Sequence, residues 1–208
     1  MAAEVQTFEL TGGALCLDFA NTMGDRPLRT EEHLVRWSDV LAWAIQAAVV
    51  SAREASALKR WAAGAGRAAE AALDEAKDLR ETIYRIFAAL AAGRSAAAPD
   101  LAALNRWLGA SLTHLRAVPA TGGYGWGWEP SSDPRRLLWP VAWSAAGLLV
   151  SDERNDVREC ASNRCSWLFV DRSRTKKRRW CSMRTCGNRA KVHRFQQRRR
   201  RRAVSGSG

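Results

Sequence analysis

The chain has 208 residues, 47% of them hydrophobic, and a formal net charge of +12 at pH 7. This composition is typical of a folded protein. No apolar run approaches the ~20 residues needed to cross a bilayer, and residues 1–5 show no basic-then-apolar pattern of a secretory signal. We therefore expect a soluble, cytoplasmic protein that makes no membrane contact.

The positive charge is concentrated near the end of the sequence. From Cys160 to Arg202 there are sixteen Lys and Arg against one acid, Asp171, a net charge of +15 that leaves −3 for the rest. A charge run is usually a solvated face or a self-repelling tail. Here it overlaps four cysteines, which favours a functional interpretation.

The first part of the chain predicts helices with little β structure. Residues 14–20 are apolar and could form a buried strand or a helical turn. Thr30 is a suitable N-cap before Glu31 and Glu32. From there a helical stripe predicts a helix, with apolar residues at Leu34, Trp37, Leu41, Ile45 and Ala48.

Further helices follow in chain order. Ser51 and Glu54 form a capping-box pattern, and Gly64 and Gly66 interrupt the helix that it begins. A stripe from Ala76 to Leu90 predicts a long amphipathic helix closed by Gly93.

Pro99 suits the first turn of the next helix, which carries Leu101, Leu104, Leu108, Leu112 and Leu115. The alternation of aromatic residues with glycine over 124–128 predicts a small hairpin. Asp133 and Pro134 begin a last helix towards Val150, kinked at Pro140. The fold class is thus α+β, mostly helical, with a helical domain over residues 1–152.

Four of the five cysteines form two matched pairs, Cys160-x4-Cys165 and Cys181-x4-Cys186, separated by fifteen residues. Such spacing matches a tetrahedral structural zinc site better than disulfides in a reducing cytoplasm. Four thiolates leave no open position for catalysis. Cys16 stands apart and is expected to be a small buried hydrophobe.

The segment between and after these pairs predicts a small treble-clef-like zinc finger with four cysteine ligands over residues 153–202, followed by a flexible tail, 203–208. Residues 167–170 and 179–180 are expected to be two short strands joined by the loop 171–177, and residues 187–195 a helix. Trp167 and Trp180 are expected to cover the small core, and His193 to lie on the helix surface.

With residues 180–189 (Trp-Cys-Ser-Met-Arg-Thr-Cys-Gly-Asn-Arg) in view, the chain resembles the CGNR zinc-finger family, named for the tetrapeptide at 186–189. Residues 167–173 and 190–191 also resemble it, and residues 15–22 are similar to the opening of the ABATE domain that precedes the finger in these bacterial proteins. The resemblance implies a stress-related transcription regulator whose N-terminal domain senses a ligand.

The basic residues of the finger supply the candidate DNA contacts. Arg suits guanine edges and phosphates, and Asn suits adenine; the alternative for Asn188 and Arg189 is a structural hydrogen bond to the knuckle. The loop and tail cations are better phosphate contacts, which make binding salt dependent. The full set is Arg172, Arg174, Lys176, Lys177, Arg178, Arg184, Asn188, Arg189, Lys191, Arg194, Arg198 and Arg199.

Asp18, Asn21 and Arg26 lie near the apolar N-terminal segment. They could form a pocket for a small-molecule effector, but capping and turn hydrogen bonds are the interpretation we favour for them.

The leading hypothesis is a DNA-binding transcription regulator that binds double-stranded DNA at the nucleoid and carries structural Zn²⁺. Its N-terminal domain would sense a ligand or form a homodimer. The alternative is an RNA- or ribosome-associated zinc-binding module. No nucleophile–base arrangement or phosphate-binding glycine loop indicates an enzyme.

Overall fold

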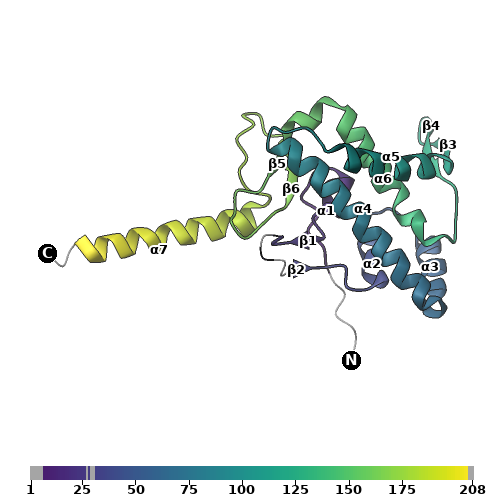
Figure 1. Cartoon of the computed structure of the whole chain (residues 1–208), viewed down its shortest axis with the longest axis horizontal. Coiled ribbons are helices and arrows are strands. Elements are labelled where there is room, and N and C mark those ends of the chain that lie inside the picture. The colour runs from purple at the N-terminus through teal and green to yellow at the C-terminus, as the bar shows by residue number, and fades with distance from the viewer. Residues whose placement is uncertain (1–6, 27, 29–30, 206–208) are drawn as a thin grey trace.

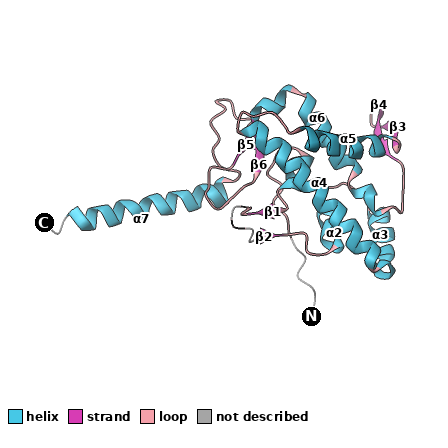
Figure 2. Ribbon diagram, in the orientation of Figure 1, coloured by secondary structure: helices cyan, strands magenta, loops and turns pink. Residues whose placement is uncertain are grey.

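The structure is a computed structural model and describes residues 7–26, 28 and 31–205, with side chains through Gln197. Within this part of the chain, helices dominate and the sheets are antiparallel strand pairs (Figure 1 and Figure 2). This confirms the expected α+β, mostly helical fold class. No helix of the described residues is long and apolar enough to cross a membrane.

The N-terminal helices pack around α1 (Leu15–Ala20), which contacts both α4 and α6. Residues 14–20, which the sequence left open between strand and helix, are therefore mainly helical, and Leu17 and Phe19 are completely buried. The other α-helices of this part are α2 (Trp37–Gln46), α3 (Ala52–Ala65), α4 (Arg67–Ala91), α5 (Ala98–Leu112) and α6 (Trp139–Val150). Short 3₁₀ helices, η1 (Pro134–Leu137) and η2 (Asp152–Asp156), flank α6.

Local signals set several helix ends as predicted. At the start of α3, the Glu54 N–H donates to Ser51 Oγ over 3.2 Å, and the Glu54 carboxylate accepts from the Ser51 N–H. Gly66, with φ +45°, separates α3 from α4, and Gly93, with φ +69°, follows the end of α4. A positive φ favours glycine because it has no Cβ.

The start of one helix and the kink in another were predicted wrongly. Glu31–Glu32 form strand β2, paired with β1 (Met23–Gly24), and α2 begins only at Trp37. The Asp39 carboxylate accepts the backbone N–H of Arg36 over 2.7 Å and so fixes the later start. The expected N-cap, Thr30, lies outside the described residues. Pro140 does not kink a helix but sits in the first turn of α6, where its missing N–H costs nothing.

The glycine- and aromatic-rich segment forms the expected hairpin. Strand β3 (Leu115–Ala120) pairs with β4 (Gly123–Trp128), and Gly122 and Gly123 at the turn have positive φ. Leu115, predicted to end α5, belongs instead to β3.

The C-terminal part contains β5 (Val157–Glu159), β6 (Leu168–Val170), a π-helical turn η3 (Met183–Gly187) and α7 (Asn188–Ser205). The predicted pairing of residues 167–170 with 179–180 was wrong, because β6 pairs with β5. The 179–180 segment instead contributes the Arg179 carbonyl, which accepts from the Ala161 N–H over 2.9 Å. The predicted helix is confirmed as α7, which extends away from the other helices (Figure 1).

Strand β6 is shared between two hydrophobic cores. Leu168 and Val170 belong to the large core of the N-terminal helices, whereas Phe169 packs with the C-terminal cysteines. Alternate residues of a strand point to opposite faces, so this three-residue strand connects the two cores directly.

Candidate functional site

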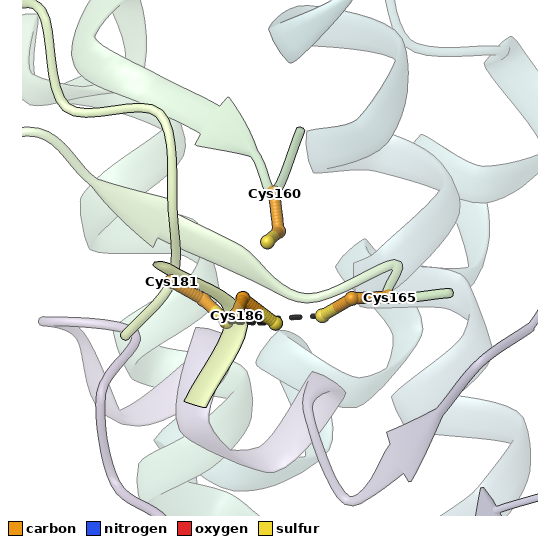
Figure 3. A group of neighbouring side chains, drawn as sticks. All are labelled: Cys160, Cys165, Cys181 and Cys186. Carbon is orange, nitrogen blue, oxygen red and sulfur yellow. Dashed lines mark hydrogen bonds between the residues drawn. The ribbon is translucent and has the colours of Figure 1, made fainter. Parts of the chain in front are cut away.

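Four cysteine side chains of the C-terminal part converge on one point (Figure 3). The Sγ atoms of Cys160, Cys165, Cys181 and Cys186 all lie within 4.8 Å of one another. Cys181 Sγ is 3.7 Å from the Sγ of both Cys165 and Cys186. Four sulfurs around a tetrahedral zinc with Zn–S bonds of about 2.3 Å would be about 3.8 Å apart, whereas a disulfide requires about 2.05 Å. The donor set therefore fits structural zinc.

Local backbone structure positions each of these thiols. Cys160 follows β5 and its N–H donates to the Trp167 carbonyl over 2.9 Å, which closes the first knuckle. Cys186 lies in η3, where the Gly187 N–H donates to the Ser182 carbonyl over 2.9 Å. A Cβ on Gly187 would lie 2.8 Å from Met183 Sδ, so a larger residue at this position would displace the Met183 side chain.

The thiols of Cys160, Cys165 and Cys181 are too close together for all of them to ionise without a cation. The neighbouring Cys160 sulfur accepts the proton of Cys181 and raises the pKa of the Cys181 thiol. A divalent ion removes this penalty because it binds the thiolate forms. The ion would stabilise the finger and pin the beginning of α7, and with four thiolate ligands it has no position left for a reacting water.

Aromatic and guanidinium groups cover the cysteines. Trp167 and Trp180 pack against the cluster, as expected from the sequence. The Arg178 guanidinium lies 4.2 Å from the centre of the Phe169 ring and donates to the backbone carbonyls of Trp180 and Cys181. Arg178 is thus part of the fold around the metal site.

The finger is hydrogen-bonded to the N-terminal domain. Asn21 Nδ2 donates to the Leu168 carbonyl over 2.9 Å, and the Leu168 N–H donates to Asn21 Oδ1 over 2.8 Å. The Val170 N–H donates to the Gly12 carbonyl over 2.8 Å. Together with the shared strand β6, these bonds fix the finger against α1.

The expected DNA-contacting cations fall into two groups. Arg172 pairs with Glu153 at 2.7 Å, and Lys176 pairs with Asp156 at 2.7 Å, so both are held by the fold. The Asn188 amide donates to the Arg184 carbonyl over 3.2 Å. The remaining cations have exposed side chains and make no ion pair within the described residues: Arg174, Lys177, Arg184, Arg189, Lys191 and Arg194. The side chains of Arg198 and Arg199 lie outside the described part.

The three N-terminal candidates have different surroundings. Arg26 pairs with Glu81, donates to the Ala20 carbonyl over 2.6 Å and stacks on the Tyr84 ring at 3.7 Å, which is a structural role. Asn21 bonds to Leu168 as described above. Asp18 accepts from the Gly12 N–H over 2.7 Å.

Asp18 and Asn21 also line a cavity of about 360 Å³ that reaches the finger. The wall of this cavity contains His33, Arg164 and Arg189 as well. Sequence reasoning did not identify His33 or Arg164 as cavity residues. The only local signal for Arg164 is its place inside the first cysteine knuckle.

Comparisons with known proteins agree with this architecture. Residues 13–152 match the ABATE family model, described as "Putative stress-induced transcription regulator", and residues 157–199 match the CGNR zinc finger model. No curated protein matches the chain. Since the first match covers most of the sequence and the four thiols are placed to hold one ion, the chain belongs to the ABATE family and carries a CGNR zinc finger with structural zinc.

Proposed function

We propose that this chain is a transcription regulator that binds double-stranded DNA with its zinc finger and α7. The observation that carries this proposal is α7 itself, an 18-residue helix with eight Lys and Arg and no acid. At 1.5 Å per residue it is about 27 Å long. A run of like charges repels itself and is typical of segments that bind nucleic acid, and DNA phosphates would neutralise it.

The major groove of DNA admits an α-helix, and the finger presents the start of α7 for this purpose. Asn188 and Lys191 are exposed at a spacing of three residues, so they share one face of the helix. Arg184 is exposed in the turn just before them. We assign base contacts to these three residues, because Arg and Asn can each form two hydrogen bonds to a purine edge.

Phosphate contacts are assigned to the unpaired cations Arg174, Lys177, Arg189 and Arg194, and to Arg198 and Arg199 further along α7. Arg172, Lys176 and Arg178 contribute less in this scheme, because their charges already have partners in the fold. They would still add to the positive potential that attracts DNA.

The N-terminal domain would receive a signal or join two copies of the chain. Its direct hydrogen bonds to β6 give an effector a physical route to the finger. Two copies would contact two half-sites of one operator. Such a protein acts at the nucleoid in the bacterial cytoplasm and performs no catalytic step.

Selection from a pool of random duplex DNA at physiological salt tests this function. We expect one motif to be enriched, and we expect Arg184→Gln and Lys191→Gln to weaken binding or relax the motif. Arg94→Gln is the matched control, because Arg94 is an exposed arginine of the N-terminal domain with no side-chain partner in the described structure.

Binding should weaken as salt rises. Loss of one phosphate contact, such as the one assigned to Arg194, should reduce the magnitude of the slope of log K against log [salt] by about 1. Equal losses in Arg94→Gln and Arg184→Gln would mean that only net charge matters. Stronger retention of structured RNA than of duplex DNA would favour the RNA-binding alternative.

A further inference from the structure

The cavity between the N-terminal domain and the finger lies beside three of the zinc ligands, Cys165, Cys181 and Cys186, and is also lined by charged side chains to which no role has been assigned. We propose that it binds a small zwitterion of amino-acid or dipeptide size, and that its occupancy withdraws Arg189 from DNA. The first part stands on the cavity alone; the second rests on the proposed function. At about 360 Å³ the cavity lies within the size range of small-molecule sites.

The two walls of the cavity carry opposite charges. The N-terminal domain contributes three carboxylates, those of Glu9, Asp18 and Glu31, and the finger contributes the guanidinium groups of Arg164 and Arg189. Among the described residues, none of these five side chains forms an ion pair. A ligand could therefore place a cationic group against the carboxylates of one wall and an anionic group against the guanidinium groups of the other.

Asp18 is half-buried, and the side chains of Glu9, Glu31, Arg164 and Arg189 are exposed to solvent at the mouth of the cavity. Elsewhere, buried guanidinium groups are matched with carboxylates, as in Arg80 with Glu32 at 2.6 Å and Arg136 with Glu54 at 3.0 Å. Within the described part of the chain, the half-buried Asp18 carboxylate accepts one hydrogen bond, from the Gly12 N–H, and burial raises the pKa of its carboxyl to about 6. An ammonium group bound beside Asp18 would supply the missing countercharge.

The finger wall would hold the acidic end of the same ligand. Arginine binds a carboxylate through two parallel hydrogen bonds, and Arg164 and Arg189 approach the cavity from two different segments, the first knuckle and α7. Phe8 and Trp167 add apolar side chains to the lining. A ligand with only one charge would satisfy only one wall.

Arg189 connects this cavity to DNA binding. It also lines the groove between the first knuckle and α7, together with Arg164, Arg179 and Arg194. A carboxylate held in the cavity would compete with DNA phosphate for the Arg189 side chain. By thermodynamic linkage, ligand and DNA would each weaken the binding of the other by the same factor.

The first experiment uses the zinc-loaded full chain without DNA, so that it is independent of the proposed function. Thermal unfolding is followed with the twenty L-amino acids and a set of dipeptides as probes. We expect at least one probe to raise Tm in a concentration-dependent manner, and its N-acetylated and its C-amidated forms to lose the effect. If no probe raises Tm, or if the blocked forms act as well as the free one, the zwitterion site is wrong.

Calorimetric titration of variants then locates the site. Loss of one charged hydrogen bond weakens binding about tenfold or more, which we expect for Asp18→Asn and Arg164→Gln. Arg174→Gln is the control, because it removes an exposed, unpaired guanidinium outside the cavity and should bind like the wild type. Wild-type affinity in Arg164→Gln would overturn the assignment.

The second part is measured with the operator recovered by selection. The bound probe should lower DNA affinity in the wild type and have no effect on it in Arg164→Gln. A probe that binds the wild-type chain and leaves its DNA affinity unchanged would overturn the coupling through Arg189, while the binding site itself would stand.

Discussion

The side-chain amide of Asn21 is hydrogen-bonded to both backbone groups of Leu168, at 2.9 Å and 2.8 Å. Asn21 follows α1 and is only 3% exposed, and Leu168 begins β6 beside the zinc site. The amide thus pairs with the strand as a neighbouring peptide group would. Phe169, the next residue of that strand, packs on the cysteines. Adjacent residues of β6 therefore contact the N-terminal domain and the zinc site.

Asn21→Asp should destabilise the protein strongly while keeping the side-chain shape. The substitution replaces the Nδ2 donor by an oxygen, which leaves the buried Leu168 carbonyl facing another acceptor. An unsatisfied buried group costs about 1–3 kcal/mol, and more when a charge is involved. We expect a loss of about 3 kcal/mol in the free energy of unfolding in urea.

Asn105→Asp is the control for this prediction, because it makes the same chemical change at an exposed position of α5. A surface substitution of this kind usually changes stability by less than about 0.5 kcal/mol. Similar losses in the two variants would contradict a specific role of the Asn21–Leu168 pair.

The sequence predicts those features that depend on local signals or on covalent spacing. The capping box at Ser51, the positive-φ glycines at 66 and 93, and the apolar stripe of α4 are all local, and each appears in the structure. Each Cys-x4-Cys pair is likewise local, because a short loop restricts how far apart its two thiols can lie, whereas the meeting of the two pairs depends on the fold of the finger.

Tertiary pairing could not be predicted in the same way. Strand β6 has an apolar pattern that would suit any neighbouring strand, and its partner β5 comes before the first cysteine, where no strand was predicted. Glu31 and Glu32 resemble a first helical turn, but Glu32 instead pairs with Arg80, which lies 48 residues away. The cavity at Asp18 depends on how the finger docks, so no local motif reveals it.

Zinc content should depend on the clustered cysteines and not on Cys16. We expect one zinc per chain in the wild type and in Cys16→Ala, and loss of zinc in Cys181→Ala, as measured by a colorimetric chelator after unfolding. The finger is small and highly charged, so loss of zinc should also expose Trp167 and Trp180 and shift their fluorescence to the red. One zinc per chain in Cys181→Ala would contradict the four-thiolate site.

Cys16 should remain unreactive in the folded protein. Its side chain is completely buried, and burial raises the pKa of the thiol to about 12, so almost no thiolate forms at neutral pH. An alkylating reagent applied to the zinc-loaded chain should therefore leave Cys16 unmodified until the protein unfolds. Modification of Cys16 by mass spectrometry under native conditions would show that α1 opens.

Asp18→Asn should stabilise the protein at neutral pH. Burial raises the pKa of Asp18 from 3.8 to about 6, so between these values the folded state binds more protons than the unfolded state. Its contribution to stability is then lost as the pH rises through this window. We expect Tm of Asp18→Asn to exceed that of the wild type at pH 7.5 and the difference to shrink towards pH 4.5. Asp74→Asn, at an exposed site on α4, controls for net charge.

Two arginines of α4 should differ sharply in their contribution to stability. Arg80 is 3% exposed and contacts both Glu32 oxygens, at 2.6 and 2.8 Å, as well as Glu81 at 2.8 Å. Arg85 has a side chain that is 53% exposed and pairs with Asp100. Removal of one partner of a buried ion pair leaves an uncompensated charge and costs about 3–5 kcal/mol, whereas exposed pairs contribute about 0–1 kcal/mol.

We therefore expect Arg80→Met to lower the free energy of unfolding at pH 7 by about 3 kcal/mol or more and Arg85→Met by less than about 1 kcal/mol. Acid should narrow this difference. Burial alone would raise the pKa of Glu32, but the hydrogen bonds from Arg80 lower it below its usual value of 4.5. The stability supplied by the pair is present above about pH 4.5 and is lost as the pH falls further. A gap between the two variants that stayed constant from pH 7 to below pH 4 would mean that Arg80 acts through its apolar stem alone.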